Sequence, residues 1–379
     1  MYKNGRKFII WLVTTLFLVS LWPVAAFGAD NSTTVSLDQA IRIVKQNFTV
    51  PPGYSNFSSG FNSSNSRQSW SLNWSDPSGQ GGSFSAEVNA ATGEVISMNS
   101  WKNNERSKTA MPAISVSEAR DIASRLLKQL IPQRFASLSS LPENQIIPLT
   151  GYSPLNYILR WERLANNIPV AGDGATVEVN LSNGEITGYN LNWSNLEVPS
   201  PAGAISSEQA GQAFIKNEIL KLQYILPSIK RPLAEKDKSQ PVLAYNIAHN
   251  SNGIIDALKG TPLEPEPGHW LQYRLSMYDK AGMGMGESSK DFSSLTPEEE
   301  KEISQTANLI SKDAAAAAVD KYIGIPSGIE LENANLDQDW QNRDIRIWNL
   351  QWSSHSSASS PSISLYARVN ALTGELVAF

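Results

Sequence analysis

One short sequence recurs and decides the fold: Val-Asn-Ala-Ala-Thr-Gly-Glu-Val-Ile at residues 88–96. Related stretches occupy residues 179–186 and 369–377, and residues 255–261 carry a degenerate copy, Ile-Asp-Ala-Leu-Lys-Gly-Thr. The glycine supplies the positive φ that a tight hairpin turn needs. The valine and isoleucine on either side are typical of β-strands. The sequence therefore predicts hairpins at the first three sites, whereas the degenerate copy has lost the turn.

A second pattern precedes each hairpin and predicts a helix. A serine follows a β-branched aliphatic residue at Ser36, Ser115, Ser206 and Ser311, where its hydroxyl can accept from the free amides of a first helical turn. The preceding aliphatic residue can pack onto that turn. In the first three copies a Gln or Glu stands three residues on and can close a capping box, whereas Ala314 in the fourth cannot. An alanine then opens an apolar stripe at helical spacing.

A tryptophan closes a strand-like segment in three copies, at Trp74, Trp161 and Trp352, and Tyr245 takes that place in the remaining copy. This common position favours packing against the helix over an exposed platform for sugars or peptides, because large aromatic side chains dominate core energetics. Helix, strand, loop, strand, turn and strand then recur in order. We therefore predict an α+β fold of four repeated modules, each a helix packed on a small antiparallel sheet.

The predicted modules span residues 35–101, 114–196, 205–261 and 310–379, the third of them degenerate, with a linker at 262–302. In two copies a further tryptophan follows the turn, Trp101 and Trp193. In the fourth copy the position equivalent to Trp101, counted from the turn residue Thr373, lies beyond Phe379. The fourth module therefore either ends early or belongs to a longer chain.

The N-terminus has the three parts of a secretory signal peptide. Lys3, Arg6 and Lys7 form a basic region, residues 8–22 are apolar or hydroxyl-bearing, and small residues follow Pro23. The apolar run is shorter than the about 20 residues that a membrane-spanning helix needs. We predict a signal peptide at residues 1–28 and a secreted, extracellular or cell-wall location. The alternative is an uncleaved segment, which would be the chain's only contact with a membrane.

Composition narrows the choice of partner. The 379-residue chain has 31 Lys and Arg against 36 Asp and Glu, a net charge of −5. Without residues 1–28 the balance is 28 against 36, or −8. An acidic chain without a basic stripe argues against nucleic acid and against an anionic membrane surface as partners. The absence of cysteine removes disulfides, thiol nucleophiles and Cys-based zinc sites.

The sequence contains no pattern typical of an active site. The three histidines, His249, His269 and His355, form no His-Glu-x-x-His motif, and there is no Gly-x-Ser-x-Gly elbow. The glycines of residues 282–286 lack the spacing of a dinucleotide fingerprint. We therefore predict a protein that is not an enzyme and uses neither cofactor nor metal. An unrecognised hydrolase is the most remote alternative.

Five residues are candidates for contact with a partner: Glu94, Glu185, Glu375, Trp101 and Trp193. The three glutamates recur beside the turn glycine. One active site rarely needs three equivalent acids, so a cross-strand pair or a role in binding is favoured over catalysis. The two tryptophans lie near predicted linkers and are expected to be partly exposed.

These patterns resemble the YcdB/YcdC repeat family of Gram-positive bacteria, whose modules look like PepSY domains. The resemblance rests on the turns around Thr92 and Thr373, on Asn-Ile-Pro-Val-Ala-Gly-Asp at 167–173 and on Leu-Thr-Pro-Glu-Glu at 295–299. It implies an exported or surface protein and brings no catalytic residues. PepSY modules also occur in propeptides of secreted metalloproteases, where an inhibitory or folding-helper role is attributed to them.

Two hypotheses for function follow from these observations. The first is a non-catalytic secreted or cell-envelope binding protein that modulates or inhibits an extracellular protease, by strand addition at a sheet edge or by occluding a cleft. The alternative is a cell-wall or surface spacer that binds a polymer through its tryptophans or loops.

Overall fold

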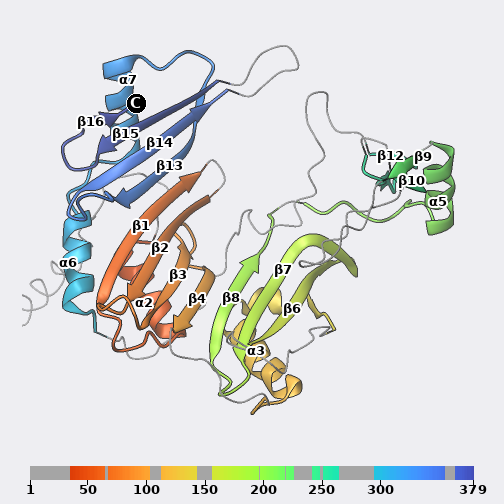
Figure 1. Ribbon diagram of the computed structural model, residues 1–379, viewed down its shortest axis with the longest axis horizontal. Coiled ribbons are helices and arrows are strands. Elements are labelled where there is room, and N and C mark those ends of the chain that lie inside the picture. The colour runs from red at the N-terminus through yellow and green to blue at the C-terminus, as the bar shows by residue number, and fades with distance from the viewer. Residues whose placement is uncertain are drawn as a thin grey trace, which may run out of the picture.

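The computed structural model describes residues 35–64, 67–102, 112–142, 156–195, 197–217, 219–225, 241–247, 251–263, 294–354 and 363–379. The chain is an α+β protein in which helices pack on antiparallel sheets, as the sequence predicts (Figure 1). The predicted signal peptide, the three histidines and the glycine-rich stretch 282–286 lie outside the described residues.

Four helices begin directly after the predicted capping serines: α2 (Leu37–Asn47), α3 (Val116–Leu130), α5 (Ser207–Lys216) and α7 (Lys312–Ile323). In α2, α3 and α5 the serine side chain accepts from the backbone N–H three residues on, and the Gln or Glu there accepts from the serine N–H. The side chain of Ser311, before α7, accepts from the backbone N–H of Ala314. Alanine has no side-chain acceptor for the serine N–H, so the capping box is incomplete there. Local hydrogen bonding therefore fixes where these helices start.

The hairpin turns follow one design in all four copies. The side chain of Asn89, Asn180 or Asn370 accepts from backbone N–H groups inside its turn, and the turn glycine has a φ of 73° to 75°. In the degenerate copy Asp256 accepts from two backbone N–H groups in the same way, and Gly260 has a φ of 67°. The prediction that this copy has lost its turn is wrong, because a carboxylate oxygen replaces the amide oxygen.

Each turn also holds the start of its helix. The residue before the capping serine donates its backbone N–H to a carbonyl in the turn, from Val35 to Ala90 at 2.9 Å and from Ile205 to Ala257 at 2.8 Å. In the first copy the indole N–H of Trp70 then donates to the carbonyl oxygen of Val35 at 2.9 Å. Helix and hairpin are therefore tied together at one end.

Twelve strands among the described residues join into one antiparallel sheet in the order β16-β15-β14-β13-β1-β2-β3-β4-β8-β7-β6-β5. They are β1 (Asn56–Ser64), β2 (Arg67–Ser75), β3 (Gly82–Asn89), β4 (Val95–Lys102), β5 (Leu138–Ser140), β6 (Asn156–Ala165), β7 (Ile168–Asn180), β8 (Ile186–Asn192), β13 (Glu330–Gln338), β14 (Arg346–Ser353), β15 (Ser364–Asn370) and β16 (Leu376–Ala378). The prediction of separate small sheets is wrong for three of the segments. Strand β1 pairs with β13 and β4 with β8, which satisfies backbone groups that separate sheets would leave open at their edges.

Helices α2, α3 and α7 pack on this sheet and share one hydrophobic core with it (Figure 1). Trp74, Trp161 and Trp352 are buried in that core, which confirms their predicted packing role. Two more buried tryptophans come from the same strands as Trp74 and Trp352, namely Trp70 of β2 and Trp348 of β14. The shared core places all three helices on one face of the sheet, and no helix within the described residues packs on the opposite face.

Helix α6 (Pro297–Thr306) lies partly inside the predicted linker, so the linker prediction is wrong over 297–302. Glu299 of this helix is buried, pairs with Lys45 of α2 at 2.9 Å and accepts from the indole N–H of Trp74 at 2.8 Å. Buried carboxylates need such partners, because removing an unpaired charge from water is costly. Helix α6 is therefore fixed against the first segment.

The segment that contains α5 stands outside the large sheet. Strands β9 (Leu220–Ile225) and β10 (Val242–Ile247) form a two-stranded sheet, and β11 (Ile255–Asp256) pairs with β12 (Thr261–Pro262). Tyr245 of β10 is exposed, unlike the tryptophans whose place it takes. The short helix α4 (Pro132–Phe135) follows α3 in the second segment.

Candidate functional site

The candidate site is the face of the large sheet opposite α2, α3 and α7, here called the open face. Successive side chains of a strand point to opposite faces, so each strand that buries apolar residues presents its alternate residues there. In β2, Leu72 and Trp74 are buried, whereas Ser71 and Asn73 between and beside them are partly exposed. The open face is accordingly polar, and short serine and asparagine side chains dominate it.

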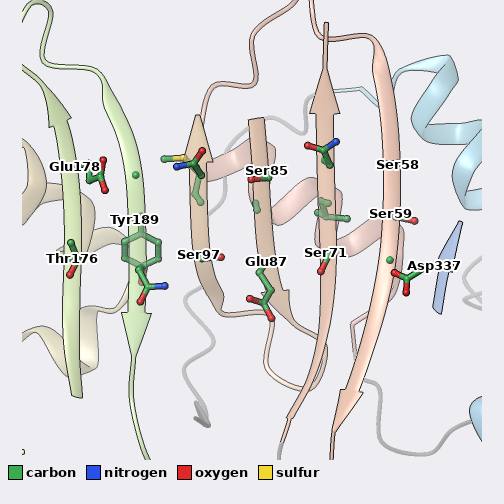
Figure 2. Close-up of a pocket in the computed structure, with 18 of the residues that line it drawn as sticks. Ser58, Ser59, Ser71, Ser85, Glu87, Ser97, Thr176, Glu178, Tyr189 and Asp337 are labelled. Atoms are coloured by element: carbon green, nitrogen blue, oxygen red, sulfur yellow. The ribbon is translucent and has the colours of Figure 1, made fainter. Parts of the chain in front are cut away.

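A hollow of ≈ 720 Å³ lies on this face, and seven strands line it: β13, β1, β2, β3, β4, β8 and β7 (Figure 2). Those of its lining residues that point to the open face form two rows that follow the register of the sheet. The first row consists of Asp337, Gly60, Ser71, Glu87, Ser97, Asn190 and Thr176. The second row consists of Ser58, Asn73, Ser85, Asn99, Gly188 and Glu178.

The rows run across the strands rather than along them, as the labelled side chains of Figure 2 show. From β13 to β7 there are six spacings between neighbouring strands, which amounts to about 29 Å at roughly 4.8 Å each. Along a strand the rows are two residues, or about 7 Å, apart. The hollow is therefore a long, shallow track, and its shape suits a linear ligand that lies across the strands.

Small residues make this track possible. A Cβ added at Gly60 would come within 3.3 Å of Asp337 Oδ1, and one at Gly188 within 3.0 Å of Glu178 Cγ. The two carboxylate side chains thus lie over glycines near opposite ends of the track. Serine and asparagine fill most of the remaining positions, so the floor stays low and carries hydrogen-bond donors and acceptors.

The charges on the track are negative. Glu87 pairs with Arg67 of β2 and accepts from Ser69, while Asn156 donates to Glu178 at 3.2 Å. Asp337 accepts from Asn349 at 3.0 Å, and burial by the surrounding protein atoms raises the pKa of its carboxyl even though the side chain remains accessible. No Lys or Arg is among the described residues that line the hollow. The track therefore suits a neutral or cationic ligand better than a polyanion.

The two tryptophans predicted to contact a partner differ in their exposure to solvent. Trp101 of β4 lies opposite Ser83, at an open-face position, and is 48% exposed as expected. Trp193 is only 9% exposed, so its predicted exposure is wrong. The guanidinium groups of Arg134 and Arg163 lie 5.0 and 4.6 Å from its ring centroid. These cation–π contacts pack Trp193 where α4 and β6 meet the end of β8.

The three recurring glutamates do not converge on one site. Glu94 is buried and pairs with Arg134 at 2.6 Å; burial raises the pKa of Glu94, and the opposing attraction of Arg134 is smaller. Glu185 pairs with Lys102 at 2.7 Å. Glu375 is exposed and accepts from a neighbouring threonine hydroxyl. Glu94 and Glu185 thus tie the first and second segments together across the β4–β8 joint, and burial withdraws Glu94 and Trp193 from contact with a partner.

Sequence reasoning missed the residues of the two rows, although the sequence holds a signal for them. Asparagine, aspartate and glycine are depleted in strands, where β-branched and aromatic residues are usual. The open-face positions of the central strands nevertheless hold Asn73, Asn99, Asn190, Gly60 and Gly188. When short polar residues of low strand propensity recur at strand positions, they indicate a surface that has a role other than folding.

Other kinds of site are not found in the part of the chain that the structure describes. The Asp and Glu side chains of these residues nowhere gather in a group of three or more that could hold a metal ion. No helix in the described ranges is long and apolar enough to cross a membrane.

Fold and open face together define an α+β protein with one long antiparallel sheet, covered by helices on one face and polar on the other. Within this fold, residues 37–193 match the YcdB, YcdC repeated domain. The chain carries this repeated domain from α2 to the end of β8, which confirms the predicted resemblance for that segment. The later segments lie outside the match.

No curated protein matches the chain. Among solved structures, the C-terminal domain of YpeB from Bacillus megaterium is similar over 60% of this chain and 95% of its own, with 18% identity and a TM-score of 0.34. A protein from Clostridium difficile 630 described as a lipoprotein is similar over 43% of this chain and 97% of its own, with 13% identity and a TM-score of 0.15. Likenesses this remote transfer no function.

Proposed function

We propose that the chain is a secreted or cell-envelope binding protein without catalytic activity, built from four related modules, and that its open face holds a linear polar polymer of the cell wall. The two rows of short polar side chains carry this proposal. They form a track of about 29 Å, which would span roughly five or six sugar rings or about nine residues of extended peptide. The envelope location rests on the predicted signal peptide and on the resemblance to exported repeat proteins.

The edges of the large sheet favour this proposal over strand addition. An extended peptide that joins a sheet needs an unpaired edge of several residues. The outer strands of the large sheet, β5 and β16, have three residues each, and each covers only part of the longer strand beside it, β6 or β15. The uncovered part of β6 or β15 is short, and the other edges of the three segments join them, so the open face offers a partner more surface than an edge does.

The β9–β10 pair supports a second candidate function, the binding of an extracellular protease. Each strand has six residues, and only one edge of each is paired within the described sheet. Large apolar side chains are exposed on both strands, among them Leu222, Tyr224, Leu243 and Tyr245. Exposed apolar patches of this kind often mark protein contacts. Strand addition by a protease loop would use this sheet, and modulation of the protease would follow from it.

Sedimentation with purified cell walls tests the first proposal. The chain from residue 29 onward should pellet with walls, and Ser85→Arg, which places a long cation in the middle of the track, should lower the bound fraction at least about tenfold. Ser304→Arg, on the exposed side of α6, introduces the same side chain away from the track and should bind as the parent does. Equal binding by all three proteins would refute the open-face site.

A protease-binding role predicts a different result. Secreted proteases should be retained by the immobilised chain, and Tyr245→Asp should release them without changing wall binding. Retention that survives Tyr245→Asp, or no retention of any protease, would count against the β9–β10 site.

A further inference from the structure

We infer that the track ends in a stacking subsite at Trp340, and that the polymer it holds is therefore a glycan. This inference rests on the proposed open-face function and specifies its ligand class. A second hollow, of ≈ 450 Å³, adjoins the first one at the β13 end. Ser58, Asn73 and Gln338 line both hollows, so the two are continuous. Trp340 lies in the lining of the second hollow, with Phe57 and Arg343.

The loop between β13 and β14 presents Trp340 to solvent and is held in place by hydrogen bonds. The side chain of Asp339 accepts from the backbone N–H groups of Gln341 at 2.8 Å and Asn342 at 3.2 Å, and it pairs with Arg368 of β15 at 2.8 Å. The backbone N–H of Asp339 also donates to the carbonyl oxygen of Ile345 at 2.9 Å. These bonds position the loop before any ligand arrives, which lowers the entropy lost on binding.

Trp340 is 78% exposed on this ordered loop. An indole ring has the largest apolar surface of any side chain, and leaving it in water is unfavourable. The tryptophans of β2 and β14 are buried in the core, so the exposure of Trp340 is not a general property of tryptophan in this chain. A flat apolar ring beside a polar track matches a ligand whose units have both an apolar face and polar edges.

A pyranose ring has this combination. One face of the ring carries axial C–H groups and can stack on an indole, while the equatorial hydroxyl or acetamido groups point outward and exchange hydrogen bonds with serine and asparagine. A peptide is a poorer match. Its backbone N–H and C=O groups require regular partners, but the backbone groups of the strands beneath the track already pair with one another.

The charge of the track limits the glycan further. Asp337 and Glu178 lie near opposite ends of the first hollow, whose described lining holds no Lys or Arg, and Arg343 in the lining of the second hollow is at the Trp340 end of the site. A polymer with phosphate on every unit would be repelled, whereas neutral or amino-bearing hexosamine chains would not. The occupant inferred here is thus a linear hexosamine glycan of about five or six units, with one terminal ring stacked on Trp340.

Titration calorimetry with a hexamer of β-1,4-linked N-acetylglucosamine, and with the fully deacetylated hexamer, tests this inference on the chain from residue 29 onward. Trp340→Ala should weaken binding about five- to tenfold, the effect of one lost aromatic contact, and Trp340→Phe should recover most of it. Tyr322→Ala removes an aromatic side chain of similar exposure from α7, away from the track, and should change nothing. Because Trp340 touches solvent on most of its surface, Trp340→Ala should unfold at the parent's temperature.

The outcomes separate the two proposals. If walls and hexamer bind, Ser85→Arg abolishes binding and Trp340→Ala does not weaken it, the stacking subsite is refuted and the open-face function stands. If the chain binds an uncharged polar peptide of nine residues and neither hexamer, the glycan assignment is refuted. If neither walls nor any probe bind, the open-face function itself fails.

Discussion

The buried cluster of Glu302, Arg346 and Ser59, which joins β1 to α6 and β14, gives the sharpest test of the architecture. Glu302 of α6 accepts from the backbone N–H of Ser59 at 3.1 Å and from its hydroxyl at 2.7 Å, and its other oxygen pairs with Arg346 of β14. Side-chain exposure is 5% for Glu302 and 3% for Arg346. The β1–β13 joint beside this cluster is registered over only four residue pairs, so we expect the cluster to contribute strongly to holding the joint together.

Glu302→Gln should lower the free energy of unfolding by about 3–5 kcal/mol, because it leaves the Arg346 charge buried without a counter-charge. The amide oxygen can still accept from Ser59, so the loss reports on the ion pair rather than on all the hydrogen bonds. Removing both charges, as in Glu302→Gln with Arg346→Met, keeps an acceptor for Ser59 and should restore most of the loss, since the desolvation of both ions is no longer required.

Urea unfolding of the full chain, followed by tryptophan fluorescence, measures these differences, and hydrogen exchange of the β1 amides locates them. Glu300→Gln, two residues earlier in α6 and exposed, serves as the matched control and should change stability by less than about 0.5 kcal/mol. A loss below about 1 kcal/mol for Glu302→Gln would mean that the pair is worth no more than an exposed one. A double variant as unstable as the single one would equally refute the reasoning.

Three further predictions concern other parts of the fold. Burial raises the pKa of Glu94 above its ordinary 4.5. This group therefore stabilises the fold fully below pH 4.5, and its contribution is lost as the pH rises through the folded pKa. Glu94→Gln should remove this part of the pH dependence in melting experiments between pH 4 and 8. Gly184→Ala should cost about 1–2 kcal/mol in urea unfolding, because φ is 73° and a Cβ would lie 3.1 Å from a side-chain carbon, whereas Gly53→Ala, which meets nothing within 4 Å, should be neutral. Trp74→Phe should cost about 1–3 kcal/mol, since the buried Glu299 loses the indole donor. A cost equal to that of Trp352→Phe, whose indole donates to no carboxylate among the described residues, would contradict this assignment.

The site could be predicted only in part. Alternation in β2 and β3 is plain in the sequence, and it separates the buried residues from the open-face residues once strands are assumed. Strand β1 lies in a Ser- and Asn-rich stretch that is typical of a loop. What alternation cannot show is which strands lie side by side. The two rows arise only when β4 pairs with β8 and β1 with β13, and their residues come from positions between 58 and 337 in the chain. The same pairing explains why Glu94 and Trp193, which look accessible at their places in the repeat, are buried at a joint.

The sequence by itself determined the local structure of this protein. The capping serines and the turn glycines act within three or four residues, so their hydrogen bonds and φ angles follow from residue identity alone, and even Asp256 preserves the turn by the same chemistry. Only the tertiary structure decided how the segments combine. The fusion of three sheets, the placement of α6 through Ser59 and Glu302, and the polar track all depend on contacts between residues far apart in the chain. Such contacts are selected by the packing and pairing of whole surfaces, which no single stretch of sequence encodes.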